Sequence, residues 1–340
     1  MPAYYTSKSA PLGLVDTTAA DRACSGKGHA RLLCLADLVK KDLTPQLLAR
    51  MQLPYAVADA RRWSNFPPMV YGNRVGVTLA ELSPAQLGAA KAMLKEVAGT
   101  AANEGYDEME QILNADDFLK NNTGQAGFAS GNFQIAFLGT PAARGTWQLY
   151  FGGHHLALSH TYRDGVLSGA TPSFRGAEPF TPFRENGRDN APMAQEQGAF
   201  AAMLQALTPA EQGKARLSQT YTDIIVGPQL DDRFPATRAG VRAGELTPSQ
   251  RQLVIRAIET YVTDIDPPDA AAILARYRAE LPDTWLAYAG TPGMNTENDY
   301  VRIDGPSVWI ELSMQPGRTV PGIHPHSVWR DRSGDYGGNK

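Results

Sequence analysis

The sequence is poor in the features that identify several protein classes. Only Cys24 and Cys34 are cysteines among its 340 residues, too few for the disulfide framework of a small secreted domain, and neither belongs to a CxxC pair. Cys34 lies among Leu32, Leu33 and Leu35. We therefore expect it to be a buried, inert thiol rather than a ligand or nucleophile.

Long apolar runs and excess charge of one sign are also missing. No stretch approaches the roughly 18 apolar residues that a membrane span needs, and the N-terminal segment MPAYYTSKSAPLG lacks the apolar core of a signal peptide. The 32 basic residues are scattered and the formal net charge is −3, which argues against a nucleic-acid partner. We expect a soluble protein without membrane contact, cytoplasmic as the sequence stands or exported if a leader has been removed.

Four familiar catalytic motifs are absent as well. The chain holds no GxSxG elbow, no GxxxxGK[ST] loop, no GxGxxG after a strand and no HExxH. The sequence therefore lacks the signature motifs of serine esterases, P-loop nucleotide-binding proteins and Rossmann-fold enzymes.

What the chain does contain is a recurring helix start. Leu-Ser/Thr-Pro occurs at Leu43, Leu82, Leu207 and Leu246. The hydroxyl can accept from free amides of the first turn, and proline in the next position loses no helical hydrogen bond. Three of the four starts have a capping-box residue, at Gln86, Glu211 and Gln250.

The spacing of these starts predicts an internal duplication. Leu43 and Leu82 lie 39 residues apart, as do Leu207 and Leu246. Two further segment pairs resemble each other: 136–141 with 287–292, and 156–159 with 310–313. We interpret residues 1–340 as a single structural unit with duplicated halves, 1–190 and 191–340. A shorter connection before Trp285 accounts for the smaller offset of the later pairs.

Each half is predicted to contain helices followed by strands. Leu87, Ala90, Leu94 and Val97 recur at helical spacing after Ser83, and a similar pattern follows Thr247. β-Branched and aromatic residues between Gly, Pro and Asn breaks predict strands at 133–138, 147–151, 155–162, 285–289, 300–303 and 308–312. This grouping indicates an α+β fold with antiparallel strands.

Histidine clustering is the sharpest chemical signal. Four of the six histidines fall in two short segments, as His154 and His155 and as His324 and His326. Imidazole is the commonest protein metal ligand, and residues two apart on an extended segment point the same way, which suits His324 and His326 to one ion. His160 is expected at the surface or behind a ligand.

The alternation of side chains along a strand, or strand parity, selects among the remaining candidate ligands. If residues 154–159 form a strand, His155 lies on the face opposite Leu156, and matching that strand to residues 308–312 places Glu311 on the same side. We therefore predict His155, His324, His326 and Glu311 as the ligands, with His154 supporting them. A glycine bulge at 152–153 would exchange the roles of His154 and His155.

Arg330 and Asp331 follow the second histidine segment. A guanidinium can clamp a carboxylate or phosphate, which makes Arg330 a candidate for orienting an anionic substrate, with Asp331 and Glu311 as further catalytic candidates. The alternative for Arg330 is an ion pair with Asp331 or Asp335. Surface pairing is the expectation for Arg175 with Glu178.

At these same residues the sequence resembles a bacterial and fungal family, domain of unknown function 3500 (DUF3500). The shared segments include Arg62-Trp63, Gly152-Gly-His-His155, the run 171–179, and His324-Pro-His-Ser-Val-Trp-Arg-Asp331. The resemblance covers nearly the whole chain and marks both histidine segments as the family's signature. It implies no substrate.

The leading hypothesis from the sequence is a metal-dependent hydrolase. Its histidines would hold a divalent ion, zinc before copper, iron or manganese, that activates water against a small anionic substrate. A non-haem iron or copper oxidoreductase is the runner-up. The third reading is a non-catalytic metal-binding or ligand-binding protein, and the sequence leaves the oligomeric state open.

Overall fold

The computed structural model describes residues 10–339. Its α-helices are α1 (Thr18–Ala23), α2 (His29–Lys40), α3 (Pro45–Met51), α4 (Val57–Ala60), α5 (Pro84–Val97), α6 (Gly105–Thr123), α7 (Ala194–Gln205), α8 (Pro209–Ala215), α9 (Pro248–Val262) and α10 (Pro267–Glu280). Within that range no helix is both long and apolar enough to cross a membrane.

All four predicted helix starts are confirmed. Thr44, Ser83, Thr208 and Thr247 are the N-caps of α3, α5, α8 and α9, each accepting a hydrogen bond from the amide three residues on, with proline following directly. The three predicted capping boxes are present. Local sequence therefore determines where these helices begin.

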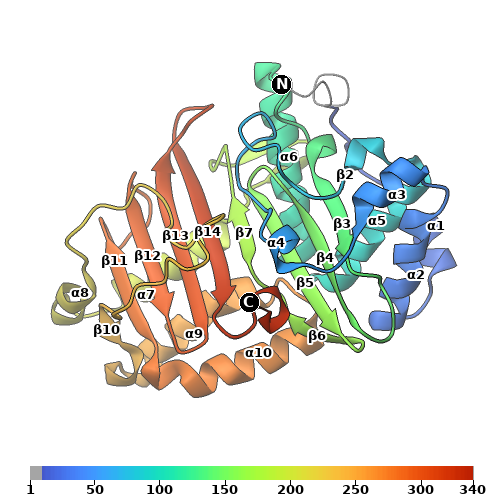
Figure 1. Cartoon of the computed structure of the whole chain (residues 1–340). Coiled ribbons are helices and arrows are strands. Elements are labelled where there is room, and N and C mark those ends of the chain that lie inside the picture. The colour runs from blue at the N-terminus through green and yellow to red at the C-terminus, as the bar shows by residue number, and fades with distance from the viewer. Residues whose placement is uncertain (1–9, 340) are drawn as a thin grey trace.

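A single large sheet forms the centre of the molecule (Figure 1). Its strands are β1 (Gln52–Leu53), β2 (Val77–Thr78), β3 (Gln134–Leu138), β4 (Thr146–Gly153), β5 (Leu156–Arg163), β6 (Val166–Gly169), β7 (Ser173–Gly176), β10 (Val241–Arg242), β11 (Trp285–Ala289), β12 (Asp299–Asp304), β13 (Val308–Pro316) and β14 (Ile323–Asp331). A separate small hairpin pairs β8 (Phe183–Glu185) with β9 (Arg188–Asn190). The predicted α+β class is confirmed.

The strand order explains how the ends of the chain meet. Along the sheet the order is β1-β3-β4-β5-β7-β14-β13-β12-β11-β10, with β2 beside β3 and β6 beside β5. All pairings are antiparallel except that of β1 with β3. The central strand β7 pairs with β5 on one side and with β14 on the other. Residues near 155 and near 325 are thereby brought together.

The order of elements repeats along the chain. A short strand (β2, β10), a 3-10 turn (Leu79–Glu81, Ala243–Glu245), two helices (α5 and α6, α9 and α10) and a three-stranded meander occur in both halves. Val77 pairs with Ile135 in the first half, and Val241 pairs with Leu286 in the second. The repeated order agrees with the predicted duplication, which itself stays a prediction.

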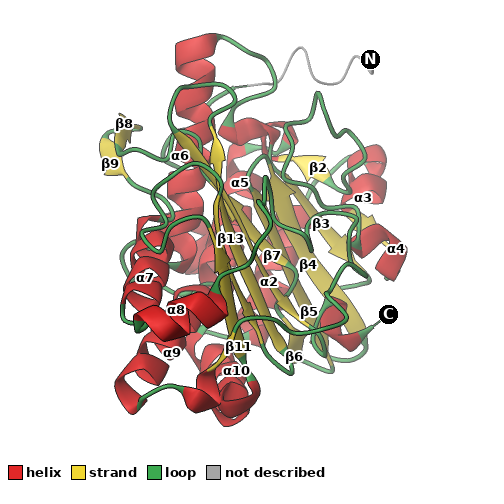
Figure 2. Ribbon diagram, turned by 90° about the vertical axis from the view of Figure 1, so that its left-hand side faces the viewer, coloured by secondary structure: helices red, strands yellow, loops and turns green. Residues whose placement is uncertain are grey.

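The two faces of the sheet have different coverings. On one, the helix face, α2 and α5 pack on β3–β5 through residues such as Phe137 and Leu149, and α7 and α9 pack on β11–β14. Figure 2 shows α6, α7, α9 and α10 on this side and mostly loops on the other. The loop face buries Trp63, Tyr150 and Phe174. The candidate site lies on the loop face.

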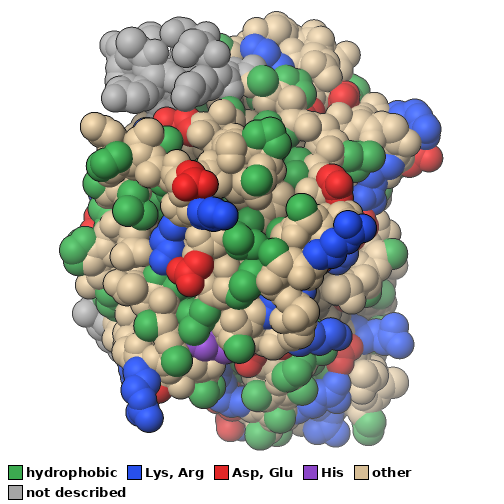
Figure 3. All heavy atoms as spheres, turned by 90° about the vertical axis from the view of Figure 1, so that its right-hand side faces the viewer, with side chains coloured by type: hydrophobic (Ala, Val, Ile, Leu, Met, Phe, Trp, Pro, Cys, Tyr) green, Lys and Arg blue, Asp and Glu red, His purple; other side chains and the backbone are tan. Residues whose placement is uncertain are grey.

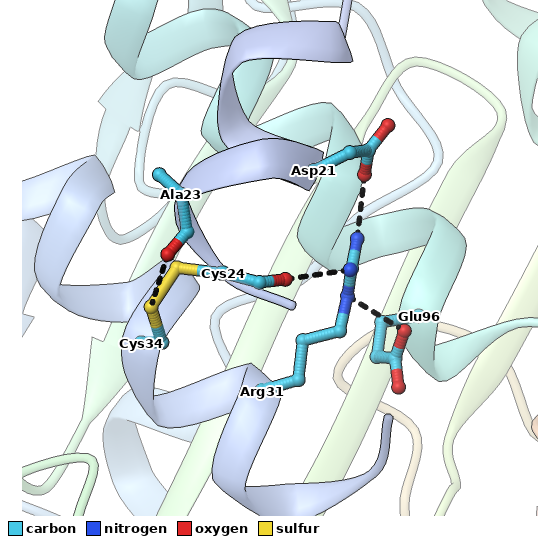
Figure 4. The surroundings of a disulfide bond; sticks show 6 residues. All are labelled: Asp21, Ala23, Cys24, Arg31, Cys34 and Glu96. Atoms are coloured by element: carbon cyan, nitrogen blue, oxygen red, sulfur yellow. Dashed lines mark hydrogen bonds and ion pairs between the residues drawn. A yellow bond between two sulfur atoms is a disulfide. The ribbon is translucent and has the colours of Figure 1, made fainter. Parts of the chain in front are cut away.

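The expectation of a free Cys34 thiol is wrong. Cys24, at the end of α1, and Cys34, in α2, form a disulfide, and Cys34 is only partly buried (Figure 4). Arg31 donates to the Cys24 carbonyl and pairs with Asp21, so the same corner is also held by polar contacts. Spacing could not reveal the bond, because an α1–α2 corner that brings the two Cα atoms to 5.7 Å is a tertiary feature.

The surface around this corner carries mixed charge. Figure 3 views the molecule from the side of α1, α2 and α3, and Lys and Arg side chains there alternate with Asp and Glu. No broad basic surface is visible on this face.

Candidate metal centre

His154 and His155 form the turn of the β4–β5 hairpin. Gly153 of β4 pairs with Leu156 of β5, so the two histidines are the connecting residues and not part of a strand. The premise of the parity argument is therefore wrong. His155 has φ of +62°, in the left-handed region that disfavours side chains with a Cβ. Unfavourable backbone conformations of this kind cluster at functional sites, so the φ of His155 is consistent with a functional side chain.

His324 and His326 alternate along β14 and share the loop face. They lie opposite Gln315 and Ser313 of β13, respectively. Residues directly opposite in an antiparallel pair share a face, so Gln315 lies on the histidine side. The predicted common orientation of His324 and His326 is confirmed, because β14 is a regular strand here.

The structure brings His155, His324 and His326 together. Nε2 of His155 lies 2.7 Å from Nε2 of His324, and a ligand atom of each of the three lies within 4.8 Å of those of the other two. Ligands about 2.0–2.1 Å from a tetrahedral zinc lie roughly 3.3 Å apart, so only a small opening separates this geometry from a coordinating one. All three are buried, at 2%, 5% and 4% exposure.

Gly176 makes room for the cluster. A Cβ at this position would lie 2.9 Å from Cδ2 of His155 and 3.1 Å from Cδ2 of His326. The Gly176 amide also donates to the carbonyl of His155 at 2.8 Å, which fixes the hairpin turn against β7. The absence of a side chain on the central strand thus allows the imidazoles to converge.

Carboxylates stand behind two of the three imidazoles. Nδ1 of His326 lies 3.0 Å from Oδ1 of Asp223, and Gln315 contacts both groups. Nδ1 of His324 is buried, has no hydrogen bond to any of the described residues, and lies 4.0 Å from Oε2 of Glu178. Carboxylates on the far ring nitrogen orient metal-binding histidines and raise their basicity. Asp223 is at hydrogen-bond distance from His326 for that task, whereas Glu178 lies near His324 without a hydrogen bond to it.

Two imidazoles of the cluster are in the protonation state that binds a cation. Burial, followed by the neighbouring histidines, lowers the pKa of His155 well below its usual value, and burial with His326 and His154 lowers the pKa of His324 to about 2. Both rings are therefore neutral near pH 7. Neutral imidazole is the form that donates a lone pair to a metal.

His154 has a different environment from His155. Its ring stacks on His155 with centroids 3.6 Å apart and packs on Phe128 from another direction. Its Nδ1 lies 2.6 Å from Oδ1 of Asp116, while Oδ2 of Asp116 is buried and has no hydrogen-bond partner in the described part of the chain. His154 lies outside the group of three, in a position to support His155.

The structure does not bring Glu311 into the cluster. Its carboxylate accepts from the amides of Ile225 and Val226 and from the side chains of Tyr300 and Trp309. Residues 216–240, which we call the strap, cross the loop face, and Glu311 anchors their middle. The predicted alternation placed Glu311 on the correct face of the sheet. However, Glu311 lies opposite Val328, two residues along β14 from His326, and its oxygens already accept these four hydrogen bonds.

Arg330 and Asp331 have structural partners. Arg330 is 1% exposed and donates to Asp231 and Asp335, as well as to the Val226 carbonyl. The ion-pair alternative with Asp335 is thus the one observed. Asp331 accepts from Tyr277, Ser333 and the Gly334 amide. Neither is free to act on a substrate in this arrangement.

Two other expectations need correction. His160 is 2% exposed on the helix face, where burial, and next Arg175, lower its pKa to about 3, so it is neither on the surface nor behind the cluster. Arg175 and Glu178 are both buried and bind other partners rather than each other. Successive strand residues point to opposite faces, which separates Arg175 from Gly176 and the site.

Sequence reasoning missed the supporting residues Asp223, Glu178, Asn65 and Gly176. The backbone carbonyl of Asn65 accepts a hydrogen bond from the His155 amide, and the side-chain Nδ2 of Asn65 lies 3.4 Å from Nδ1 of His326. Asp223 lies on the irregular strap, where no periodicity exists to detect it. Glu178 belongs to a run that the sequence had already singled out, but its partners only become visible in three dimensions.

Comparisons with known proteins agree with this signature. No curated protein and no solved structure matches the chain. A family model described as "Protein of unknown function (DUF3500)" matches residues 25–338, nearly the whole chain and both histidine segments. The chain therefore belongs to the DUF3500 family.

Proposed function

We propose that this protein is a metal-dependent hydrolase with one divalent ion on His155, His324 and His326. The observation that carries the proposal is the convergence of three buried imidazoles, two of them with a carboxylate near the outer ring nitrogen. Three nitrogen ligands with a fourth position left for water or substrate are typical of catalytic zinc sites. Zinc is the favoured ion, with copper, iron and manganese as alternatives.

The donor set suits activation of water. An ion on three imidazoles lowers the pKa of a bound water to about 7. In hydrolysis the water oxygen forms a bond to the electrophilic carbon or phosphorus, the bond to the leaving oxygen breaks, and a water proton ends on that oxygen. Asp223 is the proposed proton carrier, because its side chain is 41% exposed and Oδ2 has no hydrogen bond among residues 10–339.

The proposed substrate is a small molecule. The histidines are almost inaccessible, and the cluster borders solvent through Asp223. A small anionic substrate suits the positive charge of a bound ion. We do not expect a large polymer as substrate, because the three histidines are at most 5% exposed.

The test begins with protein purified without a polyhistidine tag. We expect about one divalent ion per chain by elemental analysis, loss of ester or phosphoester hydrolysis on chelation, and recovery when zinc is restored. Metal-bound protein that hydrolyses no substrate in a broad panel, yet shows copper or iron spectra that change with oxidant, would favour the oxidoreductase alternative. A tightly held ion that exchanges with no added ligand would favour a non-catalytic role.

We also infer that the two halves arose by duplication. The repeated series of strand, turn, two helices and meander supports it, as do the matched N-caps Ser83 and Thr247. On this view the centre lies where the halves join, since His155 comes from the first half and His324 and His326 from the second. Joints between related halves are natural places for a site.

A further inference from the structure

The loop at residues 64–66 is fastened to the β4–β5 hairpin turn. The backbone carbonyl of Asn65 accepts a hydrogen bond from the His155 amide at 3.1 Å. The guanidinium of Arg74, which is buried, donates to the carbonyls on either side of Asn65 and, at 3.0 Å, to the Gly153 carbonyl. The backbone of Asn65 therefore has a fixed position beside the candidate centre.

The side chain of Asn65 reaches the histidine cluster. Its Nδ2 lies 3.5 Å from Nε2 of His326 and 3.4 Å from Nδ1 of the same ring. Nδ1 already contacts Asp223 and Gln315, so Nε2 is the nitrogen that remains for an ion. Ligand atoms on a tetrahedral zinc lie roughly 3.3 Å apart. A group 3.5 Å from Nε2 is thus close enough to contact another ligand of the same ion.

The amide of Asn65 is buried, yet its hydrogen-bonding capacity is largely unused. The residue is 3% exposed, and its Oδ1 has no hydrogen-bond partner among residues 10–339. Within the same range its Nδ2 contacts only the ring of His326, at the upper limit of hydrogen-bond distance. Buried amides normally have partners for both ends. A polar ligand at the centre would supply them.

A second buried polar atom borders the same ring. Ser313 of β13 lies opposite His326 of β14, so both side chains are on the loop face. Ser313 is fully buried, and its Oγ has no hydrogen-bond partner in the described part of the chain. Polar groups from two separate elements, the loop and β13, are therefore available next to His326. This arrangement indicates a place for a small polar ligand.

We propose that the side-chain amide of Asn65 hydrogen-bonds the small oxygen ligand that completes the coordination of the ion, first water and then the anionic oxygen of the substrate. This inference rests on the proposed metal-dependent function and names a residue that contacts the substrate. Oδ1 can accept from water, and Nδ2 can donate to an anionic oxygen. A donor held in place in this way stabilises the negative charge that develops on a substrate oxygen during hydrolysis.

The experiment uses the full chain, without a polyhistidine tag and loaded with Co²⁺, whose visible spectrum reports changes at the ion. The probe is formate, the smallest carboxylate, and its affinity is measured from that spectrum. One variant is Asn65→Leu, which has a similar size and no hydrogen-bonding group. The other is Asn65→Asp, which has the same shape and a negative charge. Both keep the backbone carbonyl that binds the His155 amide.

Asn73→Leu and Asn73→Asp are the matched controls, because Asn73 is exposed and follows Asn65 on the same stretch of chain. Co²⁺ content, Co²⁺ affinity and circular dichroism are measured on every protein before formate is added. These measurements separate an effect on the probe from an effect on the ion or on the fold.

We expect Asn65→Leu to keep the ion and to bind formate at least about tenfold more weakly, because a hydrogen bond to a charged group is lost. Asn65→Asp should bind formate more weakly still, since its carboxylate repels the anion, while its Co²⁺ affinity is unchanged or higher. The Asn73 variants should match the parent. A residue that only supported the fold would lower both affinities together.

Equal formate affinity in the parent and both Asn65 variants, or no formate binding to the loaded parent, would overturn the inference and leave the metal site intact. Folded Asn65→Leu that takes up no ion would also overturn it, because Asn65 would then be a ligand of the ion itself. If the parent took up no metal, the proposed function would fail, and this inference with it.

Discussion

Two buried polar clusters lie back to back on the central strand β7, and they differ in what stands at their centre. On the helix face Arg175 pairs with Glu108 and Asp264, and Glu196 lies beside them. On the loop face, across Gly176, three buried imidazoles meet with no cation bonded to them among residues 10–339. Both groups have the residue types and spacing of a metal site.

The difference separates a structural cluster from a candidate functional one. Buried carboxylates need a positive partner, and Arg175 already supplies it on the helix face. The histidine cluster instead has carboxylates directed at the outer nitrogens of its rings, which leaves the inner nitrogens for an ion. We therefore expect metal on the loop face and none on the helix face.

Removing Arg175 should have the largest effect on the molecule. In Arg175→Met, Glu108 and Asp264 remain buried without their ion-pair partner, and we expect the free energy of unfolding to fall by about 3–5 kcal/mol. Chemical denaturation measures this. Arg188→Met is the control, because the Arg188–Asp107 pair is partly exposed and should cost under about 1 kcal/mol. A loss no greater than that of the control would show that Arg175 is not the counter-charge.

Single histidine variants sharpen the account of the loop face. His155→Ala should lose most metal affinity, since a ligand is removed. His154→Ala should retain the ion with affinity weakened by about tenfold, the lower end of the range for groups that support a ligand. Metal titration compares the two. If His154→Ala lost the ion and His155→Ala kept it, His154 would be the ligand and His155 the supporting residue.

The sequence predicted local features best. The helix starts at Ser83 and Thr247 follow from side chains within four residues of each other, so the information is contiguous. The strand at 285–289 was predicted at its observed bounds, because aromatic and apolar residues fill it between clear breaks. The shared orientation of His324 and His326 required only that one segment be extended.

What the sequence could not predict depended on partners far along the chain. Glu311 resembles a ligand until the strap amides of Ile225 and Val226 are seen on its oxygens, 86 and 85 residues away. The parity argument for His155 assumed a strand that is not present, because Gly153 and Leu156 pair with each other and leave a two-residue turn, although His155 rather than His154 does join the group of three. Tertiary contacts decided both cases.

The helix-face cluster should respond to pH in a way that the loop face does not. Burial and the nearby Glu108 raise the pKa of Glu196 well above its usual value, and burial raises the pKa of Asp264 to about 8. A raised pKa means that the folded protein holds these protons more tightly than the unfolded chain. The resulting stability is present below the ordinary carboxyl pKa of about 4 and is lost as pH rises toward 8.

Glu196→Gln tests this dependence with a modest expected effect. Glutamine resembles the protonated acid but cannot ionise, so the variant should melt higher than the parent at pH 9 and alike at pH 5. Exposed Glu297→Gln serves as the control. Parallel melting curves of parent and Glu196→Gln across this range would contradict the assignment of the proton.

Elemental analysis of untagged parent protein and of His324→Ala/His326→Ala tests the central claim most directly. Loss of two of three ligands leaves a weak, open site. We predict about one divalent ion per chain in the parent and none in the double variant, with circular dichroism unchanged because β14 remains paired on both sides. Equal metal content in the two proteins, or none in either, would contradict a histidine-held ion on the loop face.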